Sequence, residues 1–124
     1  MTTLFLTFGF LAFHAQAEEA KKLGNNKWSE VVVTTAKDGK SVFFKVNVGE
    51  GIKYNFDGPW KLKASGEGMK KVKKGTSDFD KTQGGFKMDV TKGVKKIDYR
   101  LTAFICTKDK KRCFREVHKA SHNI

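Results

Sequence analysis

The chain of 124 residues is short of proline, cysteine and acidic side chains. It contains one proline and two cysteines, and its 13 acidic residues stand against 25 lysines and arginines, which gives a formal net charge of +12. Apolar residues at helical spacing are also scarce, which argues against a helical bundle. A chain of this length buries a hydrophobic core without a disulfide, so the two cysteines are free to serve another purpose.

Long apolar runs are missing after residue 17, so no later segment reaches the roughly 20 residues of a membrane-spanning helix. Residues 1–17 form a shorter apolar run without charged side chains that ends in Ala15-Gln16-Ala17. Small residues at this spacing are typical of a signal-peptidase site. We expect a removed signal peptide at 1–17 and one periplasmic or secreted domain at 18–124 that does not span a membrane. A buried helix or an interfacial anchor is the alternative for residues 1–17.

The sequence offers no combination of serine, histidine and acid typical of a hydrolase, so a hydrolytic enzyme is disfavoured. Its lysines lie in glycine-rich loops with few aromatic neighbours for base stacking, and no nucleic-acid recognition motif is present. We therefore expect no specific nucleic-acid partner, and no cofactor. The excess positive charge attracts phosphates, anionic lipids and acidic proteins alike, so it does not identify a partner.

Turn residues recur at short intervals, and the segments between them alternate apolar and polar residues with the period of two typical of half-buried strands. This pattern predicts an all-β fold, an antiparallel β-sandwich of about seven or more strands, with a small barrel as the competing architecture. The expected strands cover residues 28–35, 41–48, 52–56, 60–64, 86–90, 97–106 and 114–120. The lysine-rich stretch 66–85 is expected to be a long loop.

Cys106 ends the longest predicted strand and Cys113 directly precedes the next, so the pair would bracket a hairpin with its tip at residues 107–112. Cysteines that face each other across a hairpin can form a disulfide. Their spacing differs from that of a Cys-x-x-Cys redox motif, so it leaves open a structural and an exchange-active disulfide. Nearby cations would favour the thiolate form. These cations are Lys108, Lys110, Lys111, Arg112 and Arg115.

A zinc site is a weaker alternative for the same region. Cys106, Cys113, His118 and His122 follow one another in a ligand-like order, and the two histidines could share a helix face. The spacing does not match common zinc motifs, and exported thiols tend to oxidise. We expect no metal site, and we expect both histidines to be solvated residues of a C-terminal tail.

Three segments resemble the N-terminal domain of the bacterial thiol:disulfide interchange protein DsbD and stand-alone domains similar to it. Residues 49–62 resemble its glycine- and aromatic-rich segment, residues 76–86 its cap loop, and residues 101–116 its strand-cysteine-loop-cysteine unit. The resemblance implies an immunoglobulin-like β-sandwich in the periplasm that passes reducing equivalents between thioredoxin-like partners. The basic loop between the cysteines, and the lack of a proline soon after the second one, depart from the family pattern.

The same resemblance implies roles for four residues. Cys113 would form the mixed disulfide with a partner, and Cys106 would be the resolving thiol. Phe79 would be the aromatic residue of the cap loop that shields the cysteines, with Asp78 as its acidic neighbour. An ordinary core position is the alternative role for Phe79.

The competing hypothesis is a non-enzymatic basic module that binds an anionic surface and keeps the disulfide for structure only. A lipid or glycan surface would suit such a module better than nucleic acid. The lysines that would form the surface are Lys70, Lys71, Lys73, Lys74, Lys95 and Lys96.

Overall fold

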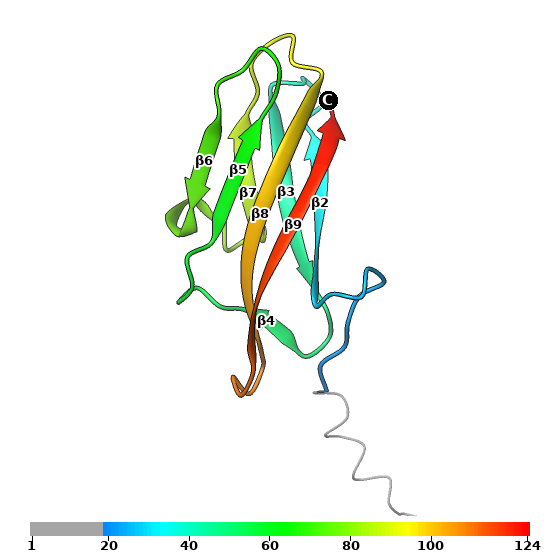
Figure 1. Cartoon of the computed structure of the whole chain (residues 1–124), viewed down its shortest axis with the longest axis vertical. Helices are drawn as coiled ribbons and strands as arrows, with labels where there is room; N and C mark the ends of the chain where they lie inside the picture. Colours follow the sequence, from blue (N-terminus) through cyan, green and yellow to red (C-terminus); the bar gives the residue numbers. More distant parts are fainter. Residues whose placement is uncertain (1–18) are drawn as a thin grey trace, which may run out of the picture.

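The computed structural model describes residues 19–124, so the expected signal peptide at 1–17 lies outside the described residues. The described part folds into two facing antiparallel sheets (Figure 1), which confirms the predicted β-sandwich. It contains no helix long and apolar enough to cross a membrane. The three-stranded sheet has the order β2 (Ser29–Thr35), β3 (Ser41–Val48), β7 (Gly85–Asp89).

The second sheet has five strands and is organised around β8 (Lys96–Thr107). One edge of β8 pairs along nearly its whole length with β9 (Cys113–Asn123). Its other edge pairs first with β5 (Lys61–Ser65) and then, near its end, with the short β4 (Ile52–Tyr54). The strand β6 (Val72–Gly75) continues the sheet beyond β5.

The core lies between the sheets and follows the predicted alternation. In β3, Val42, Phe44 and Val46 are completely or almost completely buried. The buried residues of β8 face them from the other sheet. They are Ile97, Leu101, Ala103 and Ile105. At the end of the core nearest the β8–β9 hairpin, five aromatic rings pack together. They belong to Tyr54, Phe56, Trp60, Phe79 and Phe86.

Two sequence-based expectations were wrong. The stretch 66–85 is not one long loop, because it contains β6 and a single 3-10 turn, η2 (Thr76–Asp78). Charged side chains are common on edge strands, where they discourage pairing with other chains, so the lysines of β6 hid its strand character. The C-terminal residues are not a solvated tail either, since β9 continues to Asn123.

Candidate functional site

Cys106 and Cys113 are direct cross-strand partners at the ends of β8 and β9, and a disulfide joins them. Their Cα atoms lie 3.9 Å apart. Their environments differ, because Cys106 is buried with 3% of its surface exposed, whereas Cys113 is exposed. A dissolved thiol or a docking protein can therefore approach the disulfide from the side of Cys113.

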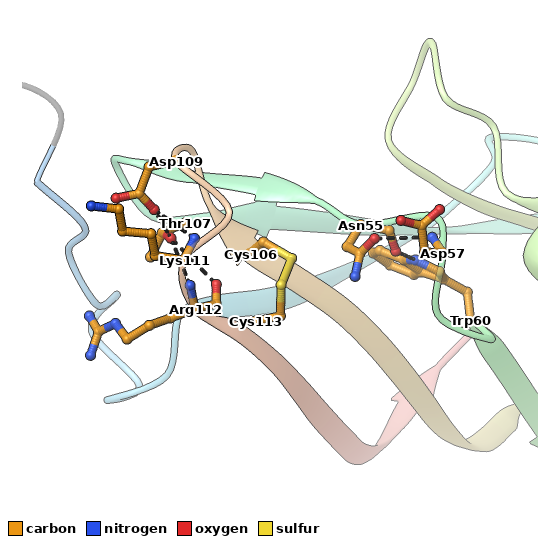
Figure 2. Close-up of a disulfide and its surroundings, with 9 residues drawn as sticks. All are labelled: Asn55, Asp57, Trp60, Cys106, Thr107, Asp109, Lys111, Arg112 and Cys113. Atoms are coloured by element: carbon orange, nitrogen blue, oxygen red, sulfur yellow. Dashed lines mark hydrogen bonds between the residues drawn. A yellow bond between two sulfur atoms is a disulfide. The ribbon is translucent and has the colours of Figure 1, made fainter.

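The hairpin tip beyond the disulfide is ordered by hydrogen bonds. The backbone N–H of Thr107 donates to the carbonyl of Arg112 at 2.8 Å, which closes the ladder directly after the cysteines. The carboxylate of Asp109 accepts hydrogen bonds from the Thr107 hydroxyl and the Lys111 N–H, and these bonds lower the pKa of Asp109. In Figure 2 the disulfide lies between this tip and the segment that carries Asn55 and Trp60.

The cations of the tip do not all surround the sulfur atoms. The Arg112 guanidinium lies 5.8 Å from the ring centre of Trp28 and 5.7 Å from that of Phe114. These two rings are stacked, with their centres 5.1 Å apart. Arg112 thus contributes a cation–π contact that holds the hairpin against the segment before β2. The lysines of the tip remain exposed to solvent.

Lys53 is a neighbour of the disulfide that sequence analysis missed. Strand β4 places Lys53 directly opposite Cys106, and residues directly opposite each other share one face of a sheet. Their Cβ atoms are expected about 5 Å apart. Residue 53 could be recognised as part of a strand from its alternating neighbours, but its pairing with Cys106 depends on the register of β4 against β8.

The two cap-loop candidates lie in different surroundings. Phe79 is 5% exposed and packs against the core rings, with its centre 5.3 Å from that of Tyr54. Tyr54 pairs with Ile105, and successive residues of a strand point to opposite faces, so this cluster and Cys106 lie on opposite faces of the sheet. Asp78 is exposed and accepts a hydrogen bond from the backbone N–H of Gly75. The role of Phe79 as a cap stays a prediction.

A second polar cluster, also missed by sequence analysis, joins β2 to β9. The hydroxyl of the fully buried Ser29 donates to the Glu116 carboxylate and lies 2.8 Å from Nε2 of His118. Burial, and secondarily the charge of Lys27, lowers the pKa of His118, while Glu116 acts in the opposite direction. Serine, histidine and acid come together here, but a hydroxyl without solvent access cannot attack a substrate. The role of the cluster is structural, because its hydrogen bonds join β2 of one sheet to β9 of the other.

The residues of the zinc alternative do not converge. The two sulfur atoms are bonded to each other, and His118 and His122 contact the hydroxyls of Ser29 and Thr35 on β2. Within residues 19–124, no three histidine, cysteine or acidic side chains are grouped closely enough to hold a metal ion.

The group that can take part in a reaction is therefore the disulfide, which has one exposed and one buried cysteine and lies next to Lys53 in the sheet. Attack on the sulfur of Cys113 would release Cys106 as a thiolate beside Lys53. Comparison of the chain with protein-family models, curated proteins and solved structures finds no match.

Proposed function

We propose that this protein is a thiol/disulfide exchange domain that passes reducing equivalents between thioredoxin-like partners outside the cytoplasm. The observation that carries the proposal is the asymmetry of the disulfide, with one exposed and one buried cysteine. An exchange site needs one sulfur that a partner can reach and a second that is retained to release the partner. The resemblance of residues 101–116 to the N-terminal domain of DsbD supports the same assignment, and with it an immunoglobulin-like form of the sandwich.

The reaction begins when a thiolate of a reduced partner dithiol attacks Sγ of Cys113. The bond between Cys106 and Cys113 breaks, and its electron pair leaves with Cys106 as a thiolate. The second thiol of the partner then displaces Cys113, so the partner becomes oxidised and both cysteines become reduced. In the reverse sequence, the Cys113 thiolate attacks the disulfide of an oxidised client, and Cys106 closes the intramolecular bond as the client leaves.

The local charges suit this sequence of steps. Thiolates are the reacting and leaving forms, and nearby cations stabilise them relative to thiols. Lys53 shares a sheet face with Cys106. The exposed lysines of the hairpin tip follow Cys106 within five residues of the chain. A leaving group with a lower pKa departs faster, so a cation beside Cys106 favours the first step.

The test is a trapping experiment with the Cys106→Ser variant. Without its resolving thiol, Cys113 should hold a thioredoxin-like protein as a mixed disulfide that survives denaturation and disappears on reduction. The matched control is Cys113→Ser, which keeps only the buried cysteine and should trap far less. Equal trapping by both variants, or trapping by neither when purified thioredoxin is offered, would disprove the exchange function and favour a structural disulfide.

A further inference from the structure

The outward face of the five-stranded sheet carries a straight row of four cations. Lys63 in β5 lies directly opposite Lys73 of β6 on one side and Arg100 of β8 on the other. Arg100 in turn lies directly opposite Lys119 of β9. All four side chains are exposed. Neighbouring strands are about 4.8 Å apart, so this cationic row extends about 14 Å across the sheet.

Within residues 19–124, none of these four cations forms an ion pair. The single ion pair in this part of the chain joins Lys21 to Glu50, away from the row. Asp98 is the one acidic residue on the outward positions of the sheet, and it accepts a hydrogen bond from Ser121. Like charges directly opposite each other weaken strand pairing. A row that costs stability and lacks internal partners points to a ligand with the opposite charge.

The cationic row shares its face of the sheet with the disulfide. Arg100 and Cys106 are separated by an even number of positions in β8, so their side chains point the same way. Six residues of extended strand place them about 20 Å apart. Lys61 and Arg115, both exposed, project from the same face between them. A protein interface of ordinary size covers about 800 Å² on each partner and therefore spans both features.

The shape and chemistry of this face favour a protein over a bilayer. A groove of about 620 Å³ follows the row, and its lining contains all four cations, Lys71 and one acidic residue, Asp98. Among the described residues the exposed large apolar side chain is Val32, which belongs to the other sheet. A surface that inserts into lipid needs exposed apolar side chains between its cations, whereas the apolar side chains on this face, Phe104 and Val117, are half-buried.

We propose that the cationic row is a docking surface for an acidic face of the exchange partner, which it steers toward Cys113. This assignment rests on the proposed exchange function and specifies the chemistry of the partner. Complementary charge mainly raises the rate of encounter, and salt suppresses the effect. The partner should therefore carry clustered carboxylates about 20 Å from its reactive cysteine.

The probe is a peptide with one cysteine, a flexible uncharged spacer long enough to span that distance, and a block of glutamates. A second peptide carries glutamines in place of the glutamates. The initial rate of mixed-disulfide formation at Cys113 is measured by mass spectrometry after acid quenching. At low salt the wild-type protein should react about tenfold faster with the glutamate peptide, and the preference should vanish at high salt.

The variant that tests the row replaces Lys63, Lys73, Arg100 and Lys119 with threonine, a residue with high strand propensity. A matched control replaces Lys37, Lys40, Lys87 and Lys92, which are exposed and lie outside the five-stranded sheet, so that the net charge changes equally. The row variant should lose the preference for the glutamate peptide, and the control should keep it. The double variant R100T/K119T repeats the measurement with fewer changes to the fold.

2-Mercaptoethanol separates the two proposals, since this small neutral thiol cannot reach the row. The wild-type protein, the row variant, the double variant and the charge-matched control should all react with 2-mercaptoethanol at the same rate. Normal reaction with 2-mercaptoethanol but an unchanged peptide preference in the row variant would overturn the docking surface alone. A disulfide inert to every thiol would overturn the exchange function and, with it, the docking role. The docking surface would also be overturned if the row variant lost binding to phosphatidylglycerol vesicles while the wild-type protein showed no preference for the glutamate peptide. That result would identify the row as a membrane-binding surface.

Discussion

Cys106 and Cys113 face each other across adjacent strands, yet one is buried and the other is exposed. The difference arises from the sheet. Cys106 belongs to β8, which has strands on both sides, whereas Cys113 begins the edge strand β9. One disulfide therefore contains a reachable sulfur and a protected one, which a two-step exchange reaction requires.

The first prediction concerns the reactivity of each cysteine alone. Cys113, left free in Cys106→Ser, should react with iodoacetamide about tenfold faster than Cys106 left free in Cys113→Ser, because access controls alkylation. The rates are measured by mass spectrometry at one pH on folded proteins. Comparable rates would show that the asymmetry does not persist in the reduced state.

The second prediction concerns Lys53. Lys53→Gln removes the positive charge of the residue directly opposite Cys106 while keeping most of the side chain. Reduction of the disulfide by 2-mercaptoethanol should slow about threefold, because the leaving thiolate is less stabilised. Lys87→Gln on the opposite sheet is the matched control and should leave the rate unchanged. An unaltered rate in Lys53→Gln would contradict a role for this residue.

The third prediction separates the two roles of Phe79. Phe79→Leu should destabilise the protein by about 1–3 kcal/mol in urea unfolding, because it leaves space among the core rings. We expect the rate of disulfide reduction in the folded protein to stay within about twofold of the wild-type rate, since the ring packs on the core face of the sheet. A roughly tenfold acceleration would instead establish the cap role implied by the DsbD resemblance.

The fourth prediction follows from the half-buried His118. The pKa of His118 is lowered from its ordinary 6.5 in the folded protein, so the unfolded chain binds a proton more readily. Stability should therefore be fully present above pH 6.5 and decline as the pH falls below that value. His118→Gln should flatten this part of the profile and cost about 1 kcal/mol at neutral pH through the altered contact with Ser29. Urea unfolding across the pH range measures both effects, and an unchanged slope would exclude His118 as the cause.

The fifth prediction concerns the disulfide as a constraint. It closes a loop of about eight residues, so reduction should lower the free energy of unfolding by about 2.5 kcal/mol without abolishing the fold. Urea unfolding of the oxidised protein and of the Cys106→Ala/Cys113→Ala variant gives the difference. Complete unfolding of the variant would show that the disulfide is essential to the structure, which would disfavour a redox cycle.

Much of the fold could be predicted from local patterns. Alternation along β3 and β8 identified the residues that face the core, because the direction of a side chain in a strand depends on position alone. The hairpin that joins Cys106 to Cys113 was predictable for the same reason, since strand, short tip and strand follow one another in the chain. The strand β6 was missed because two of its four residues are lysines and its one apolar side chain, Val72, gives no alternating pattern.

Local alternation along the chain is enough to identify most of the strands, the faces they present and the hairpin that joins the two cysteines. The pairing of Lys53 with Cys106, the packing of Phe79 in the core and the contact of Ser29 with His118 depend on how distant parts of the chain come together. The same arrangement brings four cations, scattered over residues 63–119, into one row. The physical reason is that alternation is a local property of one strand, whereas the register between distant strands depends on the loops and the packing of the whole sandwich.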